Sequence, residues 1–528
     1  MYDIIIKNGT IIDGTGKKMF PGDIGIKENK IKEIGNLQND NAEKIIDARG
    51  KYVSPGFVDI NNHSDTYWRI FLNPQLQSLI YQGITTIVGG NCGSSLAPLT
   101  SKEIIQTIQK WANIDLVNLN WLSMKEFFEE LEKRKLAVNF ATLTGHATLR
   151  RGIVRDEVRN LSEGELNLAN KMLEKSLKDG SLGFSTGLVY THAKLASKNE
   201  IVKMARTIKK MKGVYTTHVR GESEELIQAV KEALDVAKES GVSLQISHLK
   251  AIGKKSWPLF EKALAMIEKA SKEGVDVNFD VYPYTVAGSV LYVLLPDWVA
   301  EGGKKMMIHR LRDKVIREKL LREMKEDNFD YSKVIISISP LDKTLSRKKI
   351  VDIASAQGKT VEETIIDILV ASEGRVITMM DVLSEKNMIK ALSHPLSIIS
   401  TNGSGYNIEH RNSGELIHPR NFGSFPRILA RYVKEKKILS WEEAIRKMSG
   451  KPAEKFNIKK RGIIKEGNFA DIIVINPDTI EDLATPENPY QYSKGIDYVI
   501  VNGKVALNNG KLEAFQAGEV IRKKSGIF

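Results

Sequence analysis

"SPGFVDINNHSD", residues 54–65, decides the fold, because a short apolar strand ends there in a run of polar side chains. Side chains at alternate positions of a strand point to the same side, so Asp59, Asn61 and His63 would face one pocket. An acid and histidines in this spacing are typical of a metal site, and Asn61 stands where a second histidine would complete it.

Seven more apolar strands follow along the chain, and amphipathic helices fill most of the gaps. The strands are "ITTIVGG" near 84, "AVNFATLTG" near 137, "SLGFSTG" near 181, "GVYTTHV" near 213, "SLQISHL" near 243, "VDVNFDVYPY" near 275 and "LSIISTNG" near 396. Short strands that alternate with helices favour a parallel sheet. The sequence therefore predicts an α/β protein with a (β/α)8 TIM-type barrel over residues 55–455.

Both chain ends have a different texture, rich in short strands and hairpin turns. Residues 1–54 and 456–528 share it, which predicts one flanking β-sandwich built from both ends. The gap between the seventh and eighth barrel strands is too long for one helix. We expect an inserted subdomain near residues 288–390, over one mouth of the barrel.

Composition excludes several classes of function. The formal charge of +13 comes from Lys and Glu interspersed along helices, which predicts a solvated surface and no nucleic-acid partner. No apolar run is long enough to span a membrane, and Met1 leads into a strand-like stretch, so we expect a cytoplasmic protein without a membrane partner. One cysteine excludes an internal disulfide. The oligomeric state stays open.

Cys92, His218 and His248 follow or end the second, fifth and sixth strands. The carboxyl ends of barrel strands meet at one rim, so these side chains should converge there. A thiolate and two imidazoles suit tetrahedral Zn²⁺ with one position left for water, which predicts hydrolysis. The alternative for Cys92 is a small buried apolar residue.

Motifs along nearly the whole chain resemble one family. "GITTIVGGNCGSSLAPL", "YTTHVRGE", "QISHLKAIG", "DVYPYTVAGS" and "HPRNFGSFPRIL" occur in order after the opening stretch. The chain is thereby similar to the D-aminoacylase (N-acyl-D-amino-acid deacylase) family of the amidohydrolase superfamily. The resemblance implies zinc-dependent hydrolysis of the linear amide of N-acyl-D-amino acids, with one Zn²⁺ held tightly by Cys92, His218 and His248.

The resemblance also implies a weaker second metal position, in which only His63 remains as a ligand. Asn61 and Asn402 replace the family's histidine and aspartate, so we expect that position to be empty. The family's aspartate also transfers the catalytic proton, and the carboxamide of Asn402 has no accessible basic state.

Three explanations of Asn402 are open. Another residue serves as the base, and His63 is the best placed; the other candidates are Glu222, Glu409 and His410. Alternatively, the protein binds or senses acylated amino acids without turnover. In the third, deamidation of Asn402 next to Gly403 restores an aspartate.

The resemblance further implies how a substrate carboxylate is held. Lys250, Tyr284 and Arg420 occupy the family's anchoring positions, with Tyr282 as the alternative tyrosine, and Tyr190 would line the acyl side. Residues expected to orient their neighbours are His146 and Asp280. A rival reading, a cyclic-amide hydrolase such as a hydantoinase or dihydroorotase, would need a bridging lysine on the fourth strand, and "LGFSTGL" has none.

Overall fold

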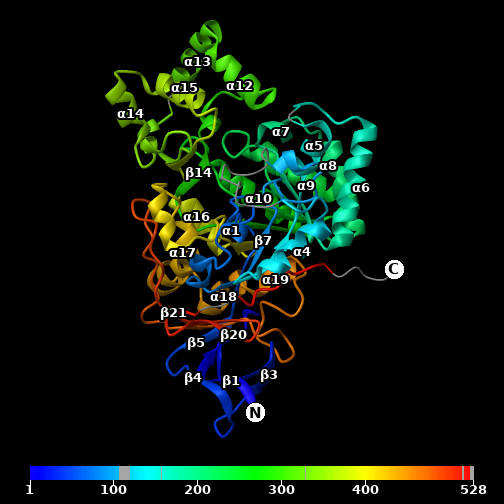
Figure 1. Ribbon diagram of the computed structural model, residues 1–528, viewed down its shortest axis with the longest axis vertical. Helices are drawn as coiled ribbons and strands as arrows, with labels where there is room; N and C mark the ends of the chain where they lie inside the picture. Colours follow the sequence, from blue (N-terminus) through cyan, green and yellow to red (C-terminus); the bar gives the residue numbers. More distant parts are fainter. Residues whose placement is uncertain (106–118, 156, 328, 514–515, 524–528) are drawn as a thin grey trace.

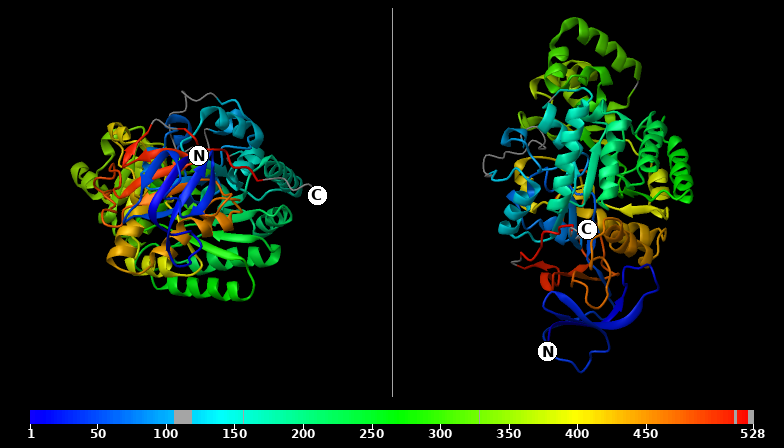
Figure 2. Two further views of the ribbon diagram at one scale, coloured as in Figure 1. Left: turned by 90° about the horizontal axis from the view of Figure 1, so that it is seen from below. Right: turned by 90° about the vertical axis from the view of Figure 1, so that its right-hand side faces the viewer.

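The computed structural model describes residues 1–105, 119–155, 157–327, 329–513 and 516–523. The molecule is elongated, with strands of both chain ends at one pole, a barrel in the middle and a largely helical insertion at the other pole (Figures 1 and 2). No helix in these ranges has the length and apolar character needed to cross a bilayer.

Eight parallel strands form the barrel. They are β6 (Phe57–Asp59), β7 (Ile84–Gly89), β8 (Asn139–Thr142) with its continuation β9 (Thr144–Gly145), β10 (Gly183–Gly187), β11 (Val214–His218), β12 (Ser243–Ile246), β13 (Val277–Val281) and β17 (Ser397–Ile399). A parallel bridge between Asn62 and Gly403 joins the ends of β6 and β17 and closes the ring. The predicted (β/α)8 barrel is confirmed.

Amphipathic helices surround these strands. The main ones are α4 (Met124–Arg134), α5 (His146–Val154), α6 (Glu163–Asp179), α8 (Lys198–Lys210), α9 (Leu226–Ser240), α10 (Leu259–Lys272), α16 (Glu385–Ser393) and α18 (Trp441–Met448). In α6 the Ser162 side chain caps the first turn by accepting from Glu165 N. Its buried residues Leu166, Ala169 and Leu173 recur every three to four positions, which directs one face to the core.

Both chain ends contribute to one branched nine-stranded sheet, which forms the flanking domain that the sequence predicts as a β-sandwich. Its strands are β1 (Tyr2–Ile11), β2 (Phe20–Lys27), β3 (Lys30–Gly35), β4 (Ala42–Asp47), β5 (Tyr52–Pro55), β18 (Ile472–Ile475), β19 (Ile496–Val501), β20 (Lys504–Asn508) and β21 (Lys511–Leu512). Antiparallel pairing of β5 with β18 joins the two ends, and a separate core that includes Ile24, Ile46 and Ile472 holds the domain together.

The insertion lies between β13 and α16. Its strands β14 (Val286–Val290), β15 (Val334–Ile338) and β16 (Ile377–Asp381) form an antiparallel sheet, with helices α11 (Asp297–Ala300), α12 (Gly303–Arg312), α13 (Lys314–Asp327), α14 (Ile350–Gln357) and α15 (Val361–Ala371) around it. The sequence placed its end near 390, but α16 packs on β13 and β17 and buries Met388 and Leu392 in the barrel core. The helix therefore belongs to the barrel layer.

Candidate metal centre

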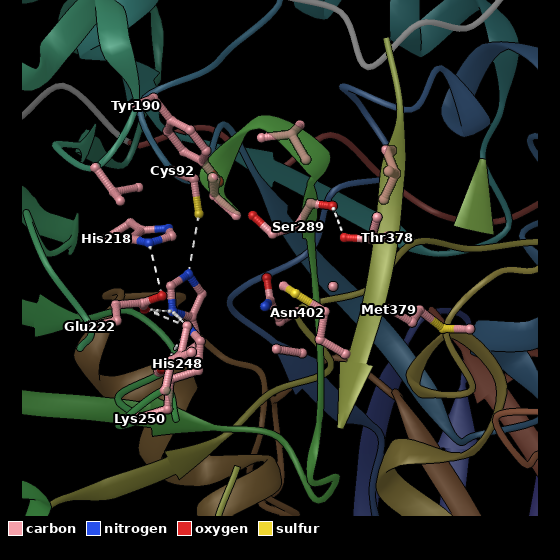
Figure 3. Close-up of a pocket in the computed structure, with 18 of the residues that line it drawn as sticks. Cys92, Tyr190, His218, Glu222, His248, Lys250, Ser289, Thr378, Met379 and Asn402 are labelled. Carbon is pink, nitrogen blue, oxygen red and sulfur yellow. Dashed lines mark hydrogen bonds and ion pairs between the residues drawn. The ribbon is translucent and has the colours of Figure 1, made fainter. Parts of the chain in front are cut away.

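Cys92, His218 and His248 come together at the carboxyl ends of the barrel strands (Figure 3). One ligand atom of each lies within 4.8 Å of the others, and all three residues are buried. Cys92 Sγ is 3.5 Å from His248 Nε2. Zinc–ligand bonds of about 2.3 Å to sulfur and 2.0–2.1 Å to nitrogen put these atoms about 3.6 Å apart in a tetrahedral site. The donor set therefore fits zinc in both chemistry and spacing.

Three residues at this rim have the left-handed backbone conformation that non-glycine residues usually avoid. The φ angles are 52° for Cys92, 37° for His248 and 47° for Asn402. Such strain persists only where the surrounding structure holds the residue, and it is frequent at functional sites. Here the three strained residues follow the ends of β7, β12 and β17, where the chain leaves the barrel.

Glu222 contacts both imidazoles from the side away from Cys92. Its Oε1 is 3.2 Å from His248 Nδ1 and its Oε2 is 3.4 Å from His218 Nε2, and it also pairs with Lys250. Burial would raise the pKa of Glu222, but the charges of His218 and Lys250 outweigh it and hold the pKa well below its usual range. Burial, with the charge of Lys250, lowers the pKa of His248 to about 3, so this ring is neutral and able to bind a metal.

His63 and Asn402 lie beside the Cys–His–His group. His63 Nε2 is 2.9 Å from Asn402 Oδ1 and 4.0 Å from Cys92 Sγ. Asn61 instead donates from Nδ2 to Asp280 Oδ1 at 3.1 Å. This second position therefore presents one imidazole and neutral amides engaged in hydrogen bonds.

Asp280 orients several groups around the site, as the sequence led us to expect. It accepts from Asn61 Nδ2, from Gln245 Nε2 at 3.0 Å, from Ser400 Oγ at 2.7 Å and from the backbone N–H of His248 at 3.0 Å. The last bond fixes the backbone that carries the His248 imidazole. His146 lies elsewhere, paired with Glu200 at 2.7 Å.

The geometry at Gly403 opposes deamidation of Asn402. That reaction needs Gly403 N to attack the Asn402 side-chain carbon. Gly403 N–H instead donates to Thr401 Oγ1 at 2.9 Å, and Gly403 is held in the bridge to Asn62 that closes the barrel. The folded chain therefore holds this nitrogen in other interactions.

A cavity of about 730 Å³ opens in front of these residues, a volume typical of small-molecule sites. It is lined by the three proposed metal ligands and by His63, Tyr190, Glu222, Lys250, Tyr282, Asn402 and Arg420. Of the other candidate bases, His410 pairs with Glu415 at 2.8 Å. Neither His410 nor Glu409 is among the described residues that line the cavity.

Tyr284, which the sequence favoured over Tyr282, does not line this cavity. Its hydroxyl lies 3.5 Å from Pro419 O, and the Arg427 guanidinium stands over its ring. Tyr284 N–H donates to Tyr282 O at 3.0 Å, a tight reversal that ends the alternation of β13. Tyr282 lines the cavity instead, and its buried hydroxyl has no hydrogen-bond partner among the described residues.

Arg420 presents an unused guanidinium to the cavity. It stands over the Tyr282 ring at 5.1 Å, and its buried Nε and Nη1 have no hydrogen-bond partner within the described chain. Buried hydrogen-bond donors are normally paired, so an anionic ligand that accepts from them would be stabilised here. A guanidinium group binds carboxylates particularly well, because it can donate two parallel hydrogen bonds.

The insertion supplies a wall of the cavity, and sequence reasoning missed the residues that form it. Ser289 of β14 and Thr378 of β16 lie across the site from Asn402 (Figure 3), and Met379 also lines the cavity. The apolar residues that the insertion contributes are Ala287, Val290, Val293, Leu294, Leu295, Pro296, Met324, Phe329, Ile338, Ile377, Met379 and Met380. The alternation of apolar and polar residues in β14 and β16 indicated two strands with distinct faces. It did not indicate which face meets the barrel.

A closed parallel barrel that carries this donor group at the carboxyl ends of its strands defines a barrel enzyme equipped for metal-assisted chemistry. Residues 44–507 match the model of the Amidohydrolase family, and the chain belongs to that family. It is a hydrolase of carbon–nitrogen bonds other than peptide bonds.

Three relatives resemble the chain over its whole length. D-aminoacylase of Alcaligenes xylosoxydans xylosoxydans is 30% identical over 99% of this chain and 98% of its own. N-acyl-D-glutamate deacylase of Bordetella bronchiseptica, solved with zinc and a phosphonate inhibitor, has a TM-score of 0.83 at 28% identity, covering 99% and 100% of the two chains. A D-aminoacylase structure that addresses one-metal activation and second-metal attenuation has a TM-score of 0.83 at 29% identity and the same coverage. The predicted resemblance is confirmed.

Proposed function

We propose that the protein hydrolyses the linear amide bond of N-acyl-D-amino acids with a single zinc ion. The observation that carries the proposal is the convergence of Cys92, His218 and His248 at the mouth of the barrel. Bound there, zinc would supply Lewis-acid polarisation of the acyl carbonyl and make a water molecule more acidic. The relatives support the substrate class, because they include D-aminoacylase and N-acyl-D-glutamate deacylase.

A single ion is favoured by the residues at the second position. Asn61 donates to Asp280, and Asn402 lies against His63. Both side chains are neutral amides, so neither supplies a negatively charged ligand to a second ion. A D-aminoacylase of known structure is described as activated by one metal and attenuated by the second. That relative supports activity with one occupied position.

Arg420, Tyr282 and Lys250 are the groups that we assign to the substrate carboxylate. Tyr282 lies beneath Arg420, and within the described chain its hydroxyl and the Nε and Nη1 donors of Arg420 have no hydrogen-bond partner. Lys250 adds a positive charge near His248, where its Nζ lies 2.9 Å from Nδ1. Tyr190, whose ring packs edge-on to His218, remains our candidate for the acyl side.

We assign proton transfer to the His63 imidazole, whose Nε2 lies 4.0 Å from the Cys92 sulfur. Asn402 Oδ1 only accepts, so in this contact it holds a hydrogen on Nε2, and the ring acts as a base when that bond is broken and the lone pair is on Nε2. Glu222 is less suited to this role, because it contacts the imidazoles from their other side and its pKa is well below the usual range. A base with a low pKa has little affinity for the proton that it must take.

The wall formed by the insertion favours an apolar group on the substrate. Among the described residues that it contributes to the cavity there is no lysine or arginine, and its one carboxylate, Glu323, accepts from Trp298 Nε1 at 2.7 Å. An acidic side chain would therefore find no counter-charge on this wall. Burial of apolar atoms against it is worth about 0.8 kcal/mol per methylene.

A second candidate function is binding or sensing of the same compounds without turnover, which the amides at positions 61 and 402 favour. Two measurements on the same compounds distinguish the enzyme from the sensor: release of the free amino acid, and binding by calorimetry. The compounds are the N-acetyl derivatives of D-leucine, D-alanine, D-glutamate and L-leucine. We expect zinc-dependent release in the order D-leucine, D-alanine, D-glutamate, with L-leucine inert. Tight binding without release identifies a sensor, and the absence of both rejects the substrate class.

A further inference from the structure

Glu222 lies between the two imidazoles of the proposed metal centre and Lys250 (Figure 3). Its backbone is fixed as well, because Ile252 N–H donates to Glu222 O at 2.7 Å and so ties the loop after β11 to the loop after β12. We propose that Glu222 is a positioning residue that selects the metal-binding tautomer of both imidazoles. The proposal rests on the metal centre of the proposed function.

His248 has two neighbours that select opposite tautomers. Its Nε2 faces Cys92 Sγ at 3.5 Å, so metal binding there requires the lone pair on Nε2 and the hydrogen on Nδ1. Nδ1 lies 3.2 Å from Glu222 Oε1 and 2.9 Å from Lys250 Nζ. A carboxylate accepts from Nδ1–H, whereas an ammonium group only donates and therefore selects the hydrogen on Nε2.

Glu222 resolves this conflict in favour of the metal. Its Oε1 pairs with the Lys250 ammonium as well as approaching Nδ1, which gives the cation another acceptor. Without the carboxylate, Lys250 would be left beside Nδ1 as a donor, and the tautomer with hydrogen on Nε2 would prevail. Nε2 would then present a hydrogen to the ion.

His218 contacts the other oxygen of the Glu222 carboxylate. Oε2 lies 3.4 Å from His218 Nε2, a contact too long for a good hydrogen bond, and the negative charge there favours the hydrogen on Nε2 and the lone pair on Nδ1. One side chain thus orients two of the three ligands. Outer carboxylates that hold metal-binding histidines affect metal affinity by about 10- to 100-fold.

The test measures zinc affinity by chelator competition in the full-length protein. We expect Glu222→Ala to bind zinc about 10- to 100-fold more weakly than the unmodified protein, while Glu224→Ala, an exposed site on the same loop, binds normally. Glu222→Gln keeps the side-chain shape and should show a smaller loss. If thermal unfolding shows that Glu222→Ala does not fold, the zinc affinity of Glu222→Gln is used to test the proposal.

A double variant separates tautomer selection from a structural role. Adding Lys250→Met to Glu222→Ala removes the donor at His248 Nδ1, so we expect zinc affinity to recover severalfold. A structural role predicts no recovery. Normal affinity of folded Glu222→Ala, or no recovery in the double variant, overturns the inference alone. If the unmodified protein binds no zinc, both this inference and the proposed function fail.

Discussion

His63 Nε2 and Asn402 Oδ1 lie 2.9 Å apart although 339 positions separate the two residues along the chain. The contact joins the loop after the first barrel strand to the end of the eighth, beside the bridge that closes the ring. An amide in this place can hold the imidazole but cannot take up a proton. The rate of the reaction should therefore depend strongly on which side chain stands at position 402.

Asn402→Asp should increase kcat, because it places a carboxylate base next to the proposed metal centre. General acid–base groups contribute about 10²–10⁴ in rate, and we expect a gain near the lower end, about 10², because His63 already acts in the unmodified protein. Steady-state kinetics on N-acetyl-D-leucine measures it. Asn402→Ala is the matched control and should give no gain. Equal kcat for the aspartate variant and the unmodified protein would mean that a carboxylate at position 402 takes no part in proton transfer.

Cys92→Ala should remove the bound metal, because the thiolate is the one anionic ligand of the proposed group. We expect about one zinc ion per chain in the unmodified protein and close to none in the variant, measured by atomic emission after dialysis. Ser94→Ala, two positions along the same loop, should keep its zinc. Full zinc content in Cys92→Ala would mean that the ion binds elsewhere.

Arg420→Lys should raise KM with a smaller effect on kcat. Lysine keeps the charge but not the planar fork that binds a carboxylate through two bonds, and a charged hydrogen bond is worth about 1.5–3 kcal/mol. The expected rise is about 10-fold or more. Arg427→Lys is the control, because Arg427 pairs with Asp482 at 2.9 Å and does not line the cavity. Similar KM values for both variants would argue against a carboxylate site at Arg420.

Asp59 should make the stability of the fold depend on pH. Burial raises the pKa of Asp59 to about 6, despite the hydrogen bond that it accepts from Thr401 Oγ1 at 2.6 Å. Between pH 4 and 6 the folded protein keeps a proton that the unfolded chain loses, so the free energy of unfolding falls as pH rises, by up to about 3 kcal/mol. Urea unfolding of metal-free protein between pH 4 and 7 measures this. Asp59→Asn should lose that part of the slope, and an unchanged slope would refute the assignment.

Much of the barrel and of the metal site could be predicted from the sequence. Apolar strands that end in polar residues are a local pattern, and the geometry of a parallel barrel then brings the ends of all strands to one rim. Cys92, His218 and His248 needed no further information to be expected together. The order of the family motifs supported the same three residues.

The tertiary structure alone decided what lies beyond the strand ends. Alternation predicts the direction of a side chain only while the backbone stays extended, and the reversal between Tyr282 and Tyr284 sends one ring into the cavity and the other against Pro419. Likewise, the helical pattern of α16 could not reveal which core it faces. The sequence by itself determined the barrel and its converging ligands, because both follow from local periodicity. The approach of Glu222 to His248 and Lys250 and the wall from the insertion depend on longer-range packing, which no local pattern encodes.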